Sequence, residues 1–306
     1  MLTRVELNDI ASLFSEGIEP EPALAPAARR RRRLGILRES VPAGLRRFSM
    51  VAANALRRRR LVGLPAILKM AFGRRPEGEA SLPDPRRAAA DIDGFVGLAP
   101  DLSPATMIEA YSRGLAPTAC FGPIAWQCPP TRFVAAPAML AEKAAEGLAG
   151  RARTFRVTFD RDVDSILVAS ATRSDCASLV PERLGAAFAE LFDAGYAHTF
   201  EVRDRGGRIV AGGYGVAVGR VFVLERVFSG GPDSAMAGLA RLAQSLRDWD
   251  FALVECGAGA APFCAEAFMA VSREAYVATL SEHMSGERVG RWPSDGARGM
   301  REARAA

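Results

Sequence analysis

Residues 197–228 of the chain are "AHTFEVRDRGGRIVAGGYGVAVGRVFVLERVF". Three segments rich in β-branched and aromatic residues, 197–204, 208–218 and 220–228, are separated by Arg205-Gly206-Gly207 and by the Val218-Gly219 step. Glycines at such short connections supply the backbone freedom that a tight hairpin turn requires. The stretch therefore predicts three antiparallel strands arranged as a meander.

The sequence that follows predicts a helix and then one more strand. A helical pattern covers residues 234–248, with Asp233 or Ser229 placed to cap it, and FALVECG at 251–257 is apolar enough for a strand buried on both faces. Three antiparallel strands, a helix and a buried strand resemble the order of the GNAT acyltransferase fold. We therefore expect an α/β (α+β) fold with a GNAT-like antiparallel meander and flanking helices.

Upstream segments predict further helices and a strand. DLSPATMIEAYSRG at 101–114 begins with the candidate caps Asp101 and Ser103, has Pro104 at the first helical position, and ends at Gly114. Alternation over 154–160 predicts a strand, and helices are expected over 162–170, over 181–195 and at 272–280.

Charge is distributed unequally along the chain. Residues 1–90 carry 18 basic against 9 acidic residues, whereas the rest carries 22 against 26. The basic residues of the first part gather in four clusters, Arg29 to Arg33, Arg46–Arg47, Arg57 to Arg60 and Arg74–Arg75.

Three interpretations of this segment stay open. Arginine clusters attract phosphates and suit tRNA. The apolar stretch 61–73 between basic flanks also suits a helix on an anionic membrane surface. A partly disordered leader that folds back on the protein is the third. We expect an Arg-rich N-terminal extension and linker over 1–93, one domain over 94–285, and a flexible tail over 286–306.

Cysteine usage argues against a disulfide scaffold or a metal site. Five cysteines without CxxC spacing, and only His198 and His283 as imidazole donors, do not form a zinc motif. The first residues lack an apolar signal-peptide core, and no run of about 18 apolar residues is present. A cytoplasmic, monomeric protein without a metal is expected, its cysteines being buried structural thiols.

Four motifs in order resemble the leucyl/phenylalanyl-tRNA–protein transferase family across roughly residues 94–280. The first is GLAPDLSPATMIEAYSRGLAPTACFGPIAWQCPPTR, similar to the family's Gly-Asp-Leu-Ser-Pro helix, Tyr-x-x-Gly and Trp-Ser-Pro stretch ending in Arg. The others are GYAHTFEV, GGYGVAVGRVF and LERVFS. Such a resemblance implies a transferase of N-end-rule protein degradation that passes leucine or phenylalanine from charged tRNA to a protein N-terminus beginning with Arg or Lys. Aminoacyl-tRNA is then the co-substrate and no cofactor is needed.

The resemblance also implies site residues. Glu225 matches the glutamate that holds the positively charged acceptor, and Glu255 matches the family's acidic residue that handles the amine proton, so both are candidate catalytic residues. Trp126 and Tyr214 match aromatics near the amino-acid pocket or the tRNA terminus, and Phe228 and Ser229 match the positions after the glutamate. His198 matches a family histidine but suits a structural role on its strand.

Several positions depart from the family pattern. Asp-Cys-Gln becomes Glu255-Cys256-Gly257, which removes the glutamine side chain. The family's His-Leu-x-Ser-Leu-Gly is replaced by Pro-Phe-Cys-Ala-Glu-Ala at 262–267, and its Phe-Pro-Trp is replaced by Ala-Pro-Thr at 116–118. Two alternatives therefore remain open: an acyl-CoA N-acyltransferase of the GNAT type, and a non-catalytic binding homologue. RVFSGGPDSAMAG lacks the glycine spacing with which such acyltransferases hold pyrophosphate.

Overall fold

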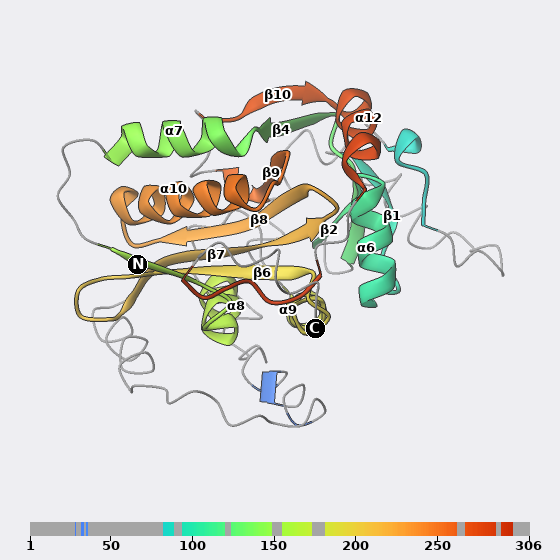
Figure 1. Cartoon of the computed structure of the whole chain (residues 1–306). Helices are drawn as coiled ribbons and strands as arrows, with labels where there is room; N and C mark the ends of the chain where they lie inside the picture. The colour runs from blue at the N-terminus through green and yellow to red at the C-terminus, as the bar shows by residue number, and fades with distance from the viewer. Residues whose placement is uncertain are drawn as a thin grey trace, which may run out of the picture.

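The computed structural model describes residues 82–88, 94–119, 124–148, 155–172, 181–261, 267–285 and 289–295, together with Ala28, Arg32, Arg33 and Gly35. Helices and two β-sheets make up this part of the chain, which confirms the expected mixed α/β class (Figure 1). The apolar segment 61–73 and Cys120, Cys176 and Cys264 lie outside the described residues.

A seven-stranded sheet forms the centre of the molecule. Its order is β10 (Met269–Ser272), β4 (Thr131–Ala135), β9 (Leu253–Gly259), β8 (Val221–Ser229), β7 (Ile209–Val218), β6 (Ala197–Arg203) and β5 (Arg156–Phe159). The pairs β6–β7 and β7–β8 are antiparallel, so the predicted meander is confirmed. Gly207 and Gly219 have φ of +81° and +56° in its two turns, a region that glycine enters without steric cost.

The helix after the meander begins earlier than predicted. Helix α10 spans Pro232–Asp248, its N-cap is Gly231, and no side chain caps it. The prediction of Asp233 or Ser229 as cap was therefore wrong. Pro232 has the fixed φ that starts a helix, so Asp233 falls inside the first turn. Helix α10 connects β8 to β9, which pair in parallel, as a helical crossover allows.

Helices cover both faces of this sheet. Alternating residues of β7 and β8, among them Phe222 and Leu224, pack in one cluster with residues of α10 and of α7 (Pro137–Leu148). The intervening side chains, among them Tyr214 and Val223, pack in a second cluster with α8 (Val163–Thr172), α9 (Glu182–Asp193) and α6 (Pro104–Ser112). The two faces of the sheet are therefore distinct, and Figure 1 shows α7 and α10 apart from α8 and α9.

A second, three-stranded sheet lies beside α6. Its antiparallel order is β1 (Phe95–Leu98), β3 (Ile124–Gln127) and β2 (Ala116–Ala119). Helix α6 has Ser103 as N-cap and Pro104 in its first turn, as predicted. Helix α12 (Arg273–His283) and the short 3-10 helix η1 (Pro85–Arg87) complete this end of the structure.

Part of the expected C-terminal tail packs on the domain. Trp292 is 3% exposed, stacks on His198 with ring centroids 4.0 Å apart, and touches Phe159 and Trp249. The backbone N–H of Trp292 donates to Asp160 over 2.8 Å. Residues 289–295 therefore hold a fixed place across β5 and β6.

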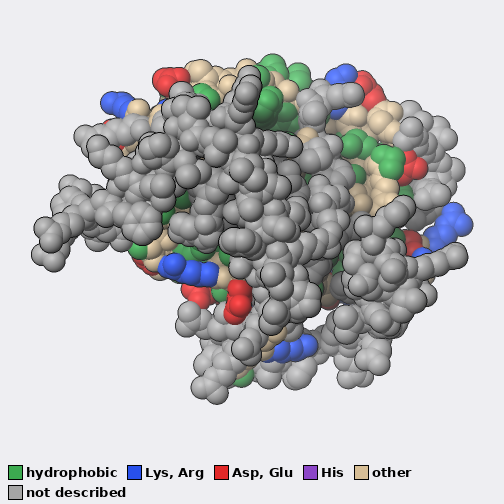
Figure 2. Space-filling model, turned by 180° about the vertical axis from the view of Figure 1, so that it is seen from behind, with side chains coloured by type: hydrophobic (Ala, Val, Ile, Leu, Met, Phe, Trp, Pro, Cys, Tyr) green, Lys and Arg blue, Asp and Glu red, His purple; other side chains and the backbone are tan. Residues whose placement is uncertain are grey.

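Charged and hydrophobic side chains both reach the described surface. Basic and acidic side chains lie around the periphery of the face in Figure 2, and hydrophobic side chains are visible at its upper edge. Large exposed apolar residues include Phe133, Met139 and Met269. Among the described residues, no helix is both long and apolar enough to cross a bilayer.

Candidate active site: two glutamates on neighbouring strands

Glu225 occupies an irregular position in the central sheet. Along β7, Gly215 pairs with Leu224 and the adjoining Tyr214 pairs with Arg226, so Glu225 is an extra residue on β8. The ladder to β9 is irregular at the same place, since Leu224 pairs with Cys256 and Arg226 with Gly259. Such a bulge interrupts pairing and redirects a side chain, and bulges are common beside active sites.

The Glu225 carboxyl group is held by one hydrogen bond. The hydroxyl of Tyr111 on α6 donates to Oε1 of Glu225 over 2.7 Å. Within the described part of the chain, no hydrogen bond to Oε2 is present, and the residue remains partly exposed. Burial, and then the nearby charge of Glu255, raise the pKa of Glu225 to about 7, whereas the Tyr111 hydrogen bond and Arg226 act in the opposite direction.

Glu255 has the opposite character, because both of its oxygens are engaged. Nε of Arg132 donates to Oε1 over 2.6 Å, a second guanidinium nitrogen contacts the same oxygen, and the Tyr276 hydroxyl donates to Oε2. The side chain of Glu255 is 5% exposed and that of Arg132 is 4% exposed. Although burial disfavours a charged guanidinium, Glu255 raises the pKa of Arg132, so the pair is a buried ion pair.

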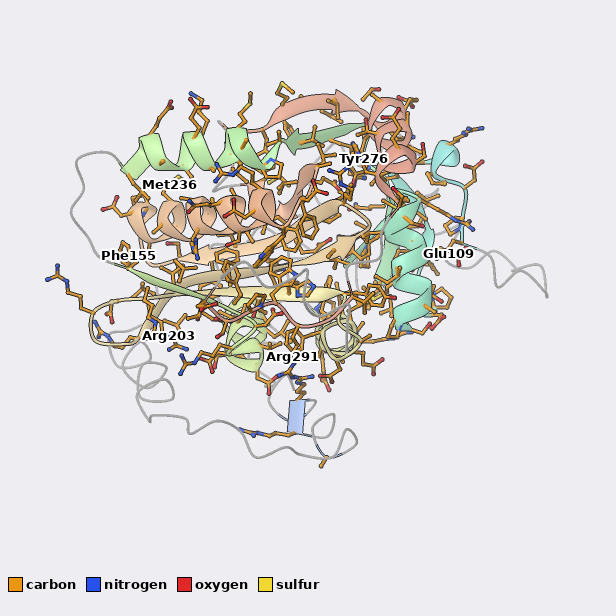
Figure 3. The ribbon with its side chains drawn as sticks, viewed as in Figure 1. Glu109, Phe155, Arg203, Met236, Tyr276 and Arg291 are labelled. Atoms are coloured by element: carbon orange, nitrogen blue, oxygen red, sulfur yellow. The ribbon has the colours of Figure 1, made fainter. Side chains whose placement is uncertain are left out.

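Three elements orient this ion pair. Arg132 lies on β4, which pairs with β9 so that Val134 is opposite Glu255. Its guanidinium also donates to the Gly114 carbonyl over 2.9 Å and lies 4.4 Å from the centre of the Tyr276 ring. Figure 3 shows Tyr276 on α12, close to β4 and β9. A guanidinium with a fork of donors suits a fixed carboxylate.

The two glutamates face the same side of the sheet. Val254 and Cys256 belong to the cluster under α10 and α7, so Glu255 between them points to the opposite face. Glu225 accepts its hydrogen bond from Tyr111, which belongs to the cluster on that opposite face, so the side chain of Glu225 points there as well. The carboxyl group of Glu255 is thus locked, whereas that of Glu225 on the adjacent strand is more accessible.

Gly257 lies directly against the bulge. A Cβ atom placed on Gly257 would be 3.0 Å from the Leu224 carbonyl oxygen and 3.3 Å from Cα of Glu225. The position that the resemblance matches to a glutamine is therefore beside Glu225, and in this chain no side chain extends from it.

The other predicted site residues separate into two groups. Tyr214 is 2% exposed, lies on β7 opposite Arg226, and its ring centre is 4.9 Å from that of Phe188 on α9. Trp126 and Phe228 are 1% and 2% exposed and are part of the core. Ser229 hydrogen-bonds to Ser234 over 2.8 Å and accepts from the Gly231 N–H over 3.1 Å. The structure therefore places Tyr214 on the strand beside Glu225, while Ser229 organises the start of α10.

His198 has the structural environment that the sequence predicted. Its Nδ1 is 2.9 Å from Asp160, and its ring stacks on Trp292. Cys128 and Cys256 are buried. In the described ranges, no group of three or more His, Cys, Asp or Glu side chains has the arrangement of a metal site.

Comparison with known proteins identifies the family. The family model described as leucyl/phenylalanyl-tRNA protein transferase matches residues 143–281. A leucyl/phenylalanyl-tRNA–protein transferase of Pseudomonas fluorescens strain Pf0-1 is 33% identical over 207 residues, 67% of this chain and 91% of the relative. The protein of the same name from Thiobacillus denitrificans is 37% identical over 183 residues, 57% of this chain and 77% of the relative. The chain belongs to the leucyl/phenylalanyl-tRNA–protein transferase family.

Within this transferase chain, sequence analysis assigned no role to three residues that hold the glutamates. Tyr111 and Arg132 lie inside the quoted family motifs, as the tyrosine of Tyr-x-x-Gly and the final arginine, so a signal for them was present. Their partners are 114 and 123 residues further along the chain, and no local pattern connects positions so far apart. Tyr276 lies in a predicted helix without a motif.

Proposed function

We propose that this chain is an aminoacyltransferase that passes leucine or phenylalanine from charged tRNA to the amino terminus of a protein. Its relatives are named leucyl/phenylalanyl-tRNA–protein transferases, which gives the donor and a protein acceptor for them. The observation that carries this proposal is the accessible carboxyl group of Glu225 beside a locked one. An amine acceptor needs a proton acceptor near neutral pH, and Glu225 has the corresponding pKa.

The proposed reaction is aminolysis of an ester. The neutral amine nitrogen attacks the carbonyl carbon of the aminoacyl ester, and a tetrahedral intermediate forms. Attack forms the C–N bond, and the amine proton leaves through a base. The intermediate then collapses: the C=O bond is restored, the bond to the ribose oxygen breaks, and the ribose oxygen gains a proton. Because the ester is already activated, positioning of the two reactants supplies much of the rate.

Glu225 is the proposed catalytic residue of this step. Its Oε2, to which no described residue donates a hydrogen bond, accepts the amine proton in this proposal, and the carboxyl group then returns a proton to the leaving ribose oxygen. A general base is most effective when its pKa lies close to the working pH, and a value of about 7 meets this condition. In its ionised state the same carboxylate attracts a positively charged acceptor.

Glu255 is the proposed positioning residue. Arg132 and Tyr276 occupy its oxygens, so it has little capacity to accept a proton from an acceptor. The negative charge of Glu255 contributes to the raised pKa of Glu225. Glutamate has a longer side chain than the aspartate that the family resemblance gives at this position, but it carries the same charge. Tyr214 is proposed to contact the transferred amino acid, with Trp126 and Phe228 supporting the site from the core and Ser229 fixing α10.

A GNAT-like fold is part of the proposal. Support comes from the order β6, β7, β8, α10 and β9, with antiparallel pairs followed by a parallel β8–β9 pair. Ligands of α/β proteins commonly bind where the course of a sheet is interrupted, and the bulge at Glu225 is such a place.

The test is transfer of labelled leucine or phenylalanine from charged tRNA to a peptide that begins with Arg. An otherwise identical N-acetylated peptide is the matched control, because its nitrogen is no nucleophile. We expect transfer to the free N-terminus and none to the blocked one. Absence of transfer to Arg- and Lys-initiated peptides, with the protein folded and the donor ester intact, would contradict the proposed acceptor class.

A further inference from the structure

Two arginines lie directly opposite each other at the edge of the central sheet. In the antiparallel β5–β6 pair, Arg156 is the cross-strand partner of Arg203. Like charges at directly opposed positions destabilise a sheet, because their Cβ atoms are only about 5 Å apart. Arg161, which follows β5, adds a third charge: burial, and then the charges of Arg161 and Arg156, lower the pKa of Arg203. We call Arg156, Arg161 and Arg203 the β5 arginine cluster.

Asp162 is the acidic partner of this cluster. It contacts Arg203, whose Nη1 also donates to the Gly207 carbonyl over 2.9 Å. Arg156 and Arg161 are exposed, and neither has an ion-pair partner within the ranges that the structure describes. Arg203 is thus held in place, while the donors of the two exposed guanidinium groups are available to a ligand.

The adjoining β6–β7 turn adds positive charge. Arg205 and Arg208 are exposed there, and Arg208 pairs with Asp204. Asp164, in the first turn of α8, is engaged in an ion pair of its own. Five arginines at this edge of the sheet therefore face two surface carboxylates, those of Asp162 and Asp204. Such an excess of guanidinium groups on one side of a domain is typical of a surface that binds phosphates.

The β5 arginine cluster is on the face of the sheet that carries Glu225. Glu201 lies between two residues of the cluster under α10, so its side chain points to the opposite face. The hydroxyl of Thr158 donates to Glu201, so Thr158 and Arg156, two residues before it, point the same way. Arg203 contacts the residue that precedes α8, and α8 packs on this face. Figure 3 shows Arg203 beside the β6–β7 turn.

Strand register gives the separation between the cluster and Glu225. Glu225 is level with Thr199 of β6, since Tyr214 pairs both with Thr199 and with Arg226. Arg203 is four residues further along β6, which is about 13 Å at about 3.3 Å per residue, and two strand spacings of about 4.8 Å separate β8 from β6. The backbones of Glu225 and Arg203 are therefore about 16 Å apart. The phosphodiester chain of a tRNA extends much further than this from its terminal ester.

We propose that the β5 arginine cluster binds phosphates of the acceptor end of the donor tRNA while the aminoacyl ester lies at Glu225. A planar guanidinium with forked donors matches phosphate oxygens, and a bound phosphate relieves the repulsion between Arg156 and Arg203. Other phosphate carriers offer the same group, but the reaction itself requires the donor to bring a chain of phosphates to this face. The inference rests on the proposed function, because it takes the ester of the donor to Glu225.

The decisive variant is Arg156→Gln/Arg161→Gln, which removes the two exposed arginines and keeps Arg203 with Asp162. Binding of uncharged tRNA is measured at several salt concentrations. We expect the Kd to rise on the order of tenfold, and the slope of log K against log salt to become shallower by about 2, about one for each lost phosphate contact. The KM for charged tRNA should rise by the same factor. The urea midpoint should stay at or above the wild-type value, because the substitution relieves like-charge repulsion.

The matched control is Arg220→Gln/Arg247→Gln, which removes the same charge at the opposite end of the sheet. Arg220 is in the β7–β8 turn, Arg247 is in the last turn of α10, and each contacts an aspartate at the surface. Exposed ion pairs of this kind contribute little to stability. Its Kd for tRNA should change by less than about twofold, since charges beyond the Debye length are screened.

Two outcomes would overturn the inference. One is that Arg156→Gln/Arg161→Gln binds tRNA no more weakly than the control Arg220→Gln/Arg247→Gln. The other is that it loses binding to phosphatidylserine vesicles while its Kd for tRNA is unchanged, because the cluster would then be a lipid site.

The same measurements separate this inference from the proposed function, because binding of uncharged tRNA requires no transfer. If the wild type transfers leucine or phenylalanine and the cluster variant keeps the wild-type Kd and KM, the function stands and the inference is overturned. If the wild type transfers nothing but the cluster variant loses tRNA binding, the proposed function is wrong and the assignment of the cluster to tRNA phosphates is supported.

Discussion

Glu225→Gln should make the protein more stable at pH 8 while removing its proton acceptor. The pKa of this carboxyl group is about 7 in the folded protein, against 4.5 in an unfolded chain. A raised carboxyl pKa means that the folded state binds more protons than the unfolded state between these two values. Stability contributed by the group is therefore present below pH 4.5 and is lost as the pH rises to about 7.

The magnitude follows from the size of this shift. One pKa unit corresponds to about 1.4 kcal/mol, so the ionised Glu225 lowers the free energy of unfolding by about 3 kcal/mol above pH 7. Glutamine at this position regains less than this free energy of unfolding, because Glu225 is partly exposed and because the hydrogen bond from Tyr111 to a charged carboxylate is lost. We expect a gain of about 1–3 kcal/mol at pH 8 and less than about 1 kcal/mol at pH 5.

Urea denaturation followed by tryptophan fluorescence is a suitable assay, because Trp126, Trp249 and Trp292 are all buried. Wild type and variant are compared at each pH. This comparison cancels the contribution of Glu201, whose pKa burial also raises to about 7, with a further rise from Asp160 and an opposing effect of its threonine hydrogen bonds.

The matched control is Glu255→Gln, a substitution of the same chemistry on the neighbouring strand. It leaves the Arg132 guanidinium buried without its counter-charge, so it should destabilise the protein by about 3–5 kcal/mol. The explanation is refuted if Glu225→Gln is no more stable than wild type at pH 8, or if its gain is the same at pH 5.

Three further substitutions probe neighbouring features. Tyr111→Phe removes the hydroxyl that lowers the pKa of Glu225, so the pH dependence of transfer should move to higher pH; an unmoved profile would exclude a link between the two groups. Gly257→Ala places a Cβ 3.0 Å from the Leu224 carbonyl oxygen and should cost about 1 kcal/mol in urea denaturation, whereas an unchanged midpoint would indicate an adaptable bulge. Trp292→Ala should lower the free energy of unfolding by about 3–5 kcal/mol; a loss below about 1 kcal/mol would show that residues 289–295 do not hold the domain together.

Local patterns in the sequence were sufficient to predict the elements around the site. Alternation and turn glycines identify β6, β7 and β8, and the Ser103–Pro104 pair identifies the start of α6. The start of α10 was predicted two residues late, because a candidate side-chain cap was given more weight than the backbone preference of Pro232. Family motifs then identified Glu225 and Glu255.

The difference between the two glutamates was not predictable from their strands. Both follow apolar residues on neighbouring strands. Glu255 is locked by Arg132 and Tyr276, whereas among the described residues the hydrogen bond of Glu225 comes from Tyr111 alone. The contacts Tyr111–Glu225 and Arg132–Glu255 depend on tertiary packing between elements more than 100 residues apart in the sequence. The position of Glu225 also depends on a β-bulge, which the alternation of residues in the sequence does not reveal. The expected monomer, the membrane contact of the leader and the domain boundaries stay predictions.

The most direct test of Glu225 as the proton acceptor is the pH dependence of kcat/KM for an Arg-initiated acceptor peptide, measured for wild type and Glu225→Gln. Two deprotonations precede transfer by the wild type: that of Glu225 near 7 and that of the acceptor amine near 8. Log kcat/KM should therefore rise by about 2 per pH unit below pH 7, by about 1 between pH 7 and 8, and level off above pH 8. For Glu225→Gln we expect a single slope of about 1 and a rate lower by about 10²–10⁴-fold. A variant that keeps the steeper slope, or the wild-type rate, would contradict the assignment of Glu225 as the base.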